Sequence, residues 1–174
     1  DSLEPMNARI VGLSFSVKPG VGYYIPLTHQ DLTAEPQLPL AEVLAFLKPW
    51  FEDSDSPKIA QNAKYDLHVM ANHDVWVKGL FEDTMLASYI LEAHKPHGMD
   101  ALALRWLNYN TIKYEEVAGK GASQITFDQV PIDTATKYAA EDAEVTLRLA
   151  HTLKAELDKV PELAKLYRDV ELPF

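Results

Sequence analysis

Tyr138-Ala-Ala-Glu-Asp142 lies inside a helix-forming run that begins at Pro131 and extends to about Leu157. Residues four apart share one face of a helix, so the phenol and the carboxylate project together. The other members of that face are almost all apolar: Ala135, Ala139, Ala143, Val145, Thr146 and Leu149. Burying a carboxylate in such a stripe is costly unless a positive charge meets it, and a metal ion supplies one. Because Tyr-x-x-x-Asp pairs are common by chance, a solvated Asp142 at the edge of the stripe is the alternative.

A second aspartate follows the junction between a predicted strand and a predicted helix. Lys58-Ile-Ala-Gln61 is typical of a short strand, and Asn62-Ala-Lys-Tyr-Asp66 opens a helix for which Asn62 is a suitable N-cap. An aspartate in the first turn is favoured by the helix dipole and needs no function. Strand-to-helix junctions in α/β sheets, however, are where ligands collect. We therefore predict that Asp66 and Asp142, from two helices, converge on one site.

Composition places the chain in a broad class and limits its metal chemistry. With 174 residues, 47% of them hydrophobic and 24% charged, it is predicted to be one globular domain. It has no apolar run long enough for a membrane span and no signal peptide, so we expect a cytoplasmic monomer without membrane contact. The absence of cysteine excludes thiolate ligands. The six histidines show no ligand spacing on one face, so a metal would be held by carboxylate oxygens.

The formal net charge of −10 is unusual for a protein that acts on nucleic acid. Proteins that hold duplex DNA through its phosphates are usually basic, whereas bound cations can reverse the local sign of an acidic site. The charge alone is equally well explained by solubility. If the partner is DNA, it favours a short single-stranded end and predicts that a partner domain provides most of the affinity.

The order of predicted elements indicates an α/β protein. Strands are predicted at 9–17, 21–27 and 58–61, and helices at 40–51, 62–73, 83–93, 99–107 and 131–157. Lys18-Pro-Gly20 is a turn signal that joins the first two strands in a hairpin. The segment 108–127 has little regular pattern and is predicted to be a mobile loop.

Four stretches together resemble a known family. They are Gln61-Asn-Ala-Lys-Tyr-Asp66, Phe81-Glu-Asp-Thr-Met-Leu-Ala-Ser-Tyr-Ile-Leu91, Glu115-Glu-Val-Ala-Gly-Lys-Gly121 and Tyr138-Ala-Ala-Glu-Asp-Ala-Glu-Val-Thr146. In order and spacing they are similar to the 3′–5′ proofreading exonuclease domain of bacterial DNA polymerase I, the Klenow-fragment domain of the DEDD type with a tyrosine in its last motif. The resemblance covers nearly the whole chain and implies that residues 1–174 are an N-terminally truncated 3′–5′ exonuclease domain. It implies a ribonuclease H-like exonuclease fold, with a mixed central sheet flanked by helices, and an end that leads toward a polymerase domain.

The resemblance also implies a two-metal hydrolysis of the terminal phosphodiester of single-stranded or frayed DNA, which releases nucleoside 5′-monophosphates. Two Mg²⁺ or Mn²⁺ ions would be the cofactors. It assigns metal binding to Asp66 and Asp142, and catalysis to these two and Tyr138, which orients the attacking water. Contacts with the 3′ end of the DNA are assigned to Leu3, Gln61, Asn62 and Tyr114.

One departure from the family pattern concerns its first motif. In the family an Asp-x-Glu pair on a central strand comes immediately before the residues that match Asp1-Ser-Leu3. We expect the natural protein to carry that motif and the chain without it to have negligible nuclease activity. Two alternatives stay open: a non-catalytic scaffold beside a polymerase, and an RNA-trimming exonuclease of the same superfamily.

Overall fold

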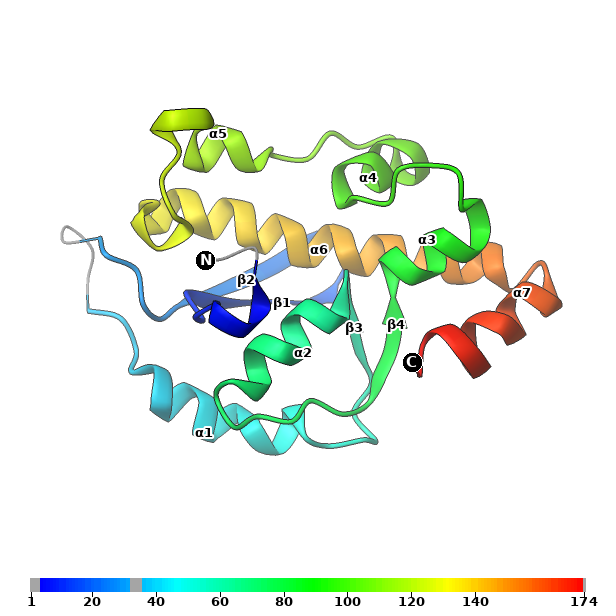
Figure 1. The fold of residues 1–174 in the computed structure, drawn as a ribbon, viewed down its shortest axis with the longest axis horizontal. Helices are drawn as coiled ribbons and strands as arrows, with labels where there is room; N and C mark the ends of the chain where they lie inside the picture. Colours follow the sequence, from blue (N-terminus) through cyan, green and yellow to red (C-terminus); the bar gives the residue numbers. More distant parts are fainter. Residues whose placement is uncertain (1–3, 32–35, 174) are drawn as a thin grey trace.

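The structure, a computed structural model, describes residues 4–31 and 36–173. A long helix, α6 (Ile132–Leu157), runs across the molecule and organises it. In Figure 1, α4 (Met99–Leu107) and α5 (Tyr114–Ala118) lie along one side of α6, while the strands β1 (Gly12–Lys18) and β2 (Val21–Pro26) lie along the other. The predicted motif helix is therefore the centre of the fold, and it ends at the predicted residue.

β1 and β2 form an antiparallel hairpin that packs directly on α6. Gly20, with φ of 82°, makes the predicted turn in a conformation that suits glycine. Gly22 lies so close to α6 that an added Cβ would stand 2.0 Å from the carbonyl oxygen of Ala140. The absence of a side chain at Gly22 thus allows the hairpin to approach the middle of the helix.

The second sheet is a parallel pair, β3 (Lys58–Ala60) and β4 (Leu80–Asp83), joined through α2 (Ala63–Ala71). Before it comes α1 (Leu40–Phe51), and after it α3 (Thr84–Glu92). The predicted mixture of parallel and antiparallel pairing is present. Among the described residues, however, the antiparallel pair β1–β2 and the parallel pair β3–β4 form two separate sheets, and no described strand joins them.

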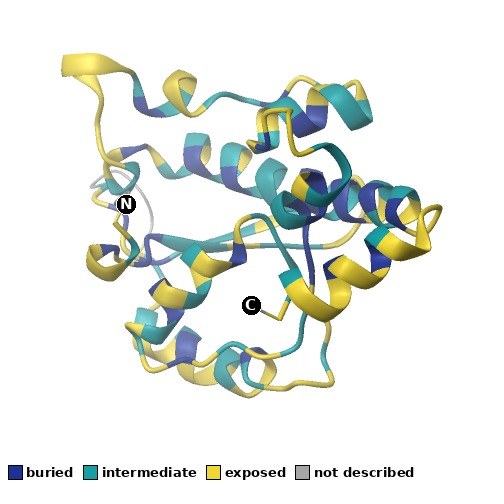
Figure 2. Ribbon diagram, turned by 45° about the vertical axis from the view of Figure 1, so that its right-hand side comes forward, coloured by how far each residue is buried: buried dark blue, intermediate teal, exposed yellow. Residues whose placement is uncertain are grey.

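The apolar stripe of α6 is buried as the sequence predicts. Ala135, Val145, Leu149 and Leu153 are fully buried, and burial of each of the larger side chains contributes roughly 1.5–3 kcal/mol to stability. Figure 2 shows the buried residues concentrated along α6 and on the inner sides of its neighbours. The face that carries Tyr138 and Asp142 therefore points toward the interior, and a fully solvated Asp142 is excluded.

The segment 108–127 differs from the prediction of a loop. It contains α5 and a 3-10 turn, η2 (Gly121–Ser123), and its last residue begins a second 3-10 turn, η3 (Phe127–Gln129). The Glu116 carboxylate accepts a hydrogen bond from the backbone N–H of Lys113, at 3.1 Å, and so closes the first turn of α5. This local capping outweighs the weak apolar period that suggested a loop.

The remaining elements lie at the two ends of the described residues. They are η1 (Pro5–Asn7), α7 (Pro161–Leu166) and a π-helical turn, η4 (Tyr167–Glu171). Tyr167 is almost fully buried and belongs to the same hydrophobic cluster as Leu149 and Leu153, which fixes the C-terminal segment against the body of the fold. Within residues 4–31 and 36–173, no helix has the length and apolar character needed to cross a membrane.

Candidate active site

Asp142 has a buried carboxylate oxygen with no protein partner. Its Oδ1 is inaccessible to solvent and makes no hydrogen bond. Burial raises the pKa of Asp142 to about 7, and the negative charges of Glu141 and Asp100 add to the rise, while a hydrogen bond with Tyr138 opposes it. An unsatisfied buried carboxylate oxygen is costly, and a bound cation would satisfy it. The unpartnered oxygen is therefore consistent with the metal-binding role that the sequence predicts for Asp142.

The two neighbouring acids that raise the pKa of Asp142 are held in place by other residues. Glu141 accepts hydrogen bonds from the Tyr109 hydroxyl at 2.6 Å and from the backbone N–H of Ile112 at 2.7 Å. Asp100, in the first turn of α4, accepts one from the Thr111 hydroxyl and lies 3.1 Å from Lys113 Nζ. The negative field at Asp142 therefore comes from two acids, Glu141 and Asp100, that are both held in place by protein contacts.

Tyr138 belongs to an aromatic cluster that we define as Tyr114, Phe127 and Tyr138. The ring of Tyr138 is 6.0 Å from that of Tyr114 and 5.9 Å from that of Phe127, centroid to centroid. Burial raises the pKa of the Tyr138 phenol well above its usual value, with the charge of Asp142 as the next contribution. The phenol therefore stays protonated at neutral pH, as it must to donate a hydrogen bond to a water.

Tyr114 is the exposed member of the aromatic cluster. It opens α5, is 39% exposed, and stacks on Phe127 with the ring planes inclined by 28° at 6.3 Å. The structure thus brings Tyr114 to Tyr138, as a substrate-binding role requires, and that role itself stays a prediction. Phe127 was not singled out in the sequence, because ten residues separate it from Tyr138 and no periodic pattern links the two.

Asp66 lies in the first turn of α2 and is exposed to solvent. The protein packed around its carboxyl raises the pKa of Asp66 to about 6, and the charge of Asp83 adds to the rise. α2 begins directly after β3, which contacts α6 (Figure 1). The convergence of Asp66 with Asp142 stays a prediction. Within the described part of the chain, no three His, Asp or Glu side chains group as a metal site.

The two residues before α2 are used differently from each other. Gln61 donates its amide N–H to the carbonyl of His97, at 3.0 Å, and accepts a hydrogen bond from the Thr84 hydroxyl. Asn62 is the N-cap residue, but its side chain makes no cap hydrogen bond, so the predicted side-chain cap is wrong. With φ of 61° and ψ of 53°, Asn62 adopts the left-handed conformation that asparagine tolerates better than most residues.

The substrate contacts predicted for Gln61 and Asn62 therefore stay predictions, with Asn62 the freer of the two side chains because Gln61 is engaged at both ends of its amide. Leu3, the remaining predicted contact, lies outside the described residues.

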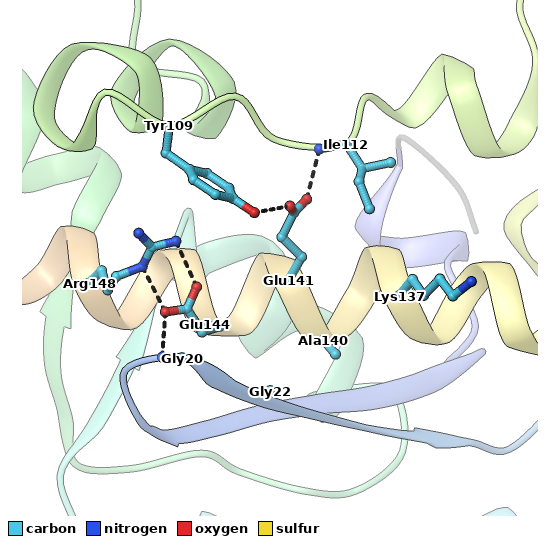
Figure 3. A pocket seen from close by; sticks show the side chains of 9 residues that line it. All are labelled: Gly20, Gly22, Tyr109, Ile112, Lys137, Ala140, Glu141, Glu144 and Arg148. Atoms are coloured by element: carbon cyan, nitrogen blue, oxygen red, sulfur yellow. Dashed lines mark hydrogen bonds and ion pairs between the residues drawn. The ribbon is translucent and has the colours of Figure 1, made fainter.

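A separate surface hollow of about 490 Å³ lies over an adjacent face of α6. Figure 3 shows its lining side chains pairing with one another: Arg148 with Glu144 at 2.7 Å, and Glu144 with the Gly20 backbone N–H at 2.8 Å. Its lining consists of Gly20, Gly22, Tyr109, Ile112, Lys137, Ala140, Glu141, Glu144 and Arg148. The acids in this lining, Glu141 and Glu144, have protein partners, whereas Oδ1 of Asp142 has none.

Comparison with known proteins places this site in a family. The model of a family described as 3′–5′ exonuclease matches residues 1–158. The chain belongs to the 3′–5′ exonuclease family. It is 46% identical to DNA polymerase I of Pseudomonas aeruginosa and 41% identical to that of Chloroflexus aurantiacus, over 99% of the chain in each case. It spans only 19% and 18% of the length of these relatives.

A solved structure agrees with the assignment. The POL domain of Pol1 from M. smegmatis, in complex with DNA primer-template and dNTP, superposes on 84% of the chain with a TM-score of 0.60 and 26% identity, and the match covers 21% of that protein. The α/β exonuclease fold and the 3′–5′ exonuclease class predicted from the four stretches are thus confirmed at the level of the family.

Proposed function

We propose that this chain is the hydrolytic 3′–5′ exonuclease domain of a longer DNA polymerase, with Asp66, Tyr138 and Asp142 in its active site. The observation that carries the proposal is the buried, unpartnered Oδ1 of Asp142, one helical turn from a protonated phenol. Membership of the 3′–5′ exonuclease family supports the reaction class. The substrate we propose is a single-stranded or frayed 3′ end of DNA, from which nucleoside 5′-monophosphates are released.

Each residue contributes what its surroundings allow. Asp142 offers an oxygen without a protein partner to a cation, and Asp66 places a second carboxylate in the first turn of α2. Tyr138 keeps its proton and can orient a water by donating a hydrogen bond. Oxygen ligands suit Mg²⁺ or Mn²⁺, and two such ions, when bound, would lower the pKa of a water and offset charge on the leaving oxygen.

We propose that residues outside the described ranges contribute the remaining ligands. Two observations support a contribution from outside the described residues. These residues offer no group of three metal-ligating side chains, and their strands form two separate sheets.

The aromatic cluster and the net charge both favour a single-stranded end as the substrate. Tyr114, exposed beside Tyr138, offers a face on which a terminal base can stack, a contact that contributes about 1–3 kcal/mol for any base. A domain with net charge −10 is unsuited to hold duplex DNA by itself. We therefore propose that a polymerase domain of the same chain supplies most of the DNA affinity, in a monomeric cytoplasmic protein.

The test is digestion of a single-stranded oligodeoxynucleotide, labelled at its 5′ end, by the full-length protein with Mg²⁺. Asp142→Ala should reduce the rate by about a hundredfold or more, because it removes a metal ligand. The control is Asp133→Asn, which changes an exposed carboxylate of the same helix and should leave the rate unchanged.

Undiminished digestion by Asp142→Ala would overturn the proposed site. A full-length protein that is folded but digests no DNA would favour the non-catalytic scaffold. Faster digestion of an RNA of the same sequence would favour the RNA-trimming alternative.

A further inference from the structure

Asp83 ends β4 and caps the helix that follows it. Its residue is 2% exposed, and the carboxylate accepts hydrogen bonds from the backbone N–H groups of Met85 at 2.9 Å and Leu86 at 3.2 Å. These contacts satisfy the free N–H groups at the start of α3. Taken alone, they describe an ordinary N-cap.

The same carboxylate also holds the start of a second helix. It accepts hydrogen bonds from the N–H of Asn62 at 3.2 Å and from that of Ala63 at 2.7 Å. Asn62, the N-cap residue of α2, contributes no side-chain cap of its own. The N-termini of α2 and α3 therefore meet on one buried carboxylate, and α2 depends on a residue about twenty positions further along the chain.

We propose that Asp83 is a positioning residue for Asp66. Asp66 follows Ala63 by three residues, so it lies on the turn of α2 that the Asp83 carboxylate fixes. Because Asp83 also anchors α3, it sets where the first turn of α2, with the Asp66 carboxylate, stands relative to the rest of the fold. This inference rests on the proposed function, in which Asp66 is a metal ligand.

A purely structural role for Asp83 predicts a different outcome, and Tyr167 provides the matched control. The backbone N–H of Asp83 donates to the Tyr167 hydroxyl at 2.8 Å. Tyr167→Phe removes both hydrogen bonds between the Tyr167 hydroxyl and the backbone of Asp83 but leaves all four contacts of the Asp83 carboxylate. It should therefore lower stability without moving Asp66.

Asp83→Asn is the decisive variant because an amide has one acceptor oxygen where the carboxylate has two. Oδ1 accepts three of the four N–H groups, and Oδ2 accepts only that of Ala63. The arrangement that keeps the most hydrogen bonds places the new NH₂ group against the Ala63 N–H, where two donors face each other. The variant should therefore lose the contact with Ala63 in the first turn of α2, while it keeps the contact with Asn62 and the cap of α3.

The first readout uses metal-free protein and no substrate. In full-length Asp83→Asn, amide hydrogen exchange at Ala63 and the rest of the first turn of α2 should become about tenfold faster, while that at Met85 and Leu86 stays near wild type. Tyr167→Phe should not produce this difference between the two helices.

The second readout is the Mg²⁺ requirement of digestion. Residues that orient metal ligands typically contribute 10- to 100-fold in metal affinity. The Mg²⁺ concentration for half-maximal rate should therefore rise by about 10- to 100-fold in Asp83→Asn, with the KM for DNA little changed, and excess Mg²⁺ should restore part of the rate. Tyr167→Phe should keep the wild-type Mg²⁺ requirement.

Wild-type exchange in α2 together with a wild-type Mg²⁺ requirement would overturn the inference. Asp66→Ala, assayed in parallel, separates the two proposals: if it digests DNA normally, the proposed function fails, whereas if it is inactive and Asp83→Asn is normal, only the positioning role fails. If Asp83→Asn does not fold, Asp83→Ser tests the positioning role in its place. A serine can still cap α3 but is too short to reach Ala63, so the same two readouts apply.

Discussion

Asp142 and Glu144 lie two residues apart on α6, and both carry buried carboxylates with opposite surroundings. The Glu144 carboxylate accepts a hydrogen bond from the backbone N–H of Gly20, and both of its oxygens pair with the guanidinium group of Arg148. Asp142 has a buried oxygen with no partner and additional negative charge nearby. The protein thus provides all the partners of the Glu144 carboxylate, whereas one oxygen of Asp142 is left to bind a ligand. Burial alone therefore does not separate a structural acid from a functional one, whereas its partners do.

The largest difference between these two acids should appear in catalysis. In the full-length protein, Asp142→Asn should slow digestion of single-stranded DNA by about a hundredfold or more, since an amide is a poor ligand for a hard cation. Glu144→Gln should stay within a few-fold of wild type, because Glu144 contacts only protein. The measurement is the initial rate at saturating Mg²⁺, and equal losses in the two variants would break the comparison.

The raised pKa of Asp142 should make the stability of the metal-free protein depend on pH. The pKa of Asp142 is about 7 when folded and about 3.9 when unfolded, so between these values the folded chain binds the proton more tightly. The free energy of unfolding should therefore fall as pH rises from about 4 to 7, by about 2–4 kcal/mol, and level off above. The measurement is the free energy of unfolding in urea as a function of pH. It should not fall in this way in Asp142→Asn, and bound Mg²⁺ should offset the fall in the wild type.

Gly22→Ala should weaken the hydrogen bond from Gly20 to Glu144 and so leave Glu144, like Asp142, with fewer protein partners. The new methyl group would stand 2.0 Å from the Ala140 carbonyl oxygen, so the hairpin must move away from α6. Overpacking of this kind costs about 1–3 kcal/mol, and the shift also stretches the bond from Gly20 to Glu144. Urea unfolding measures the loss; an unchanged midpoint would show that the hairpin is free to shift without cost.

The smallest effect is expected where Phe127 supports Tyr138. Phe127→Leu removes ring contacts with Tyr138 and Tyr114, and an aromatic pair contributes about 0.5–1.5 kcal/mol beyond its buried area. Digestion should slow by a few-fold with the Mg²⁺ requirement unchanged, because the carboxylates are untouched. A changed Mg²⁺ requirement would show that the cluster also shapes the surroundings of Asp142.

The sequence was sufficient to predict what depends on local period and on linked motifs. The apolar stripe of α6 predicted both the long helix and the inward face that carries Asp142, and the four stretches predicted the family. The double cap by Asp83 was beyond reach, because it requires two helix N-termini from distant segments to meet in space. Phe127 was missed for the same reason: its contact with Tyr138 follows from tertiary packing and not from spacing.

The shortness of the parallel strands has a consequence for how the protein loses activity. β3 has three residues and β4 has four, too few to be stable as an isolated pair, whereas α6 has 26 residues and a fully buried core. Local opening should therefore begin around β3 and α2, which carry Asp66, while α6 persists. As the denaturant concentration rises, nuclease activity should be lost before the helical circular dichroism signal in the far ultraviolet declines. Inactivation and global unfolding would then be two separate transitions.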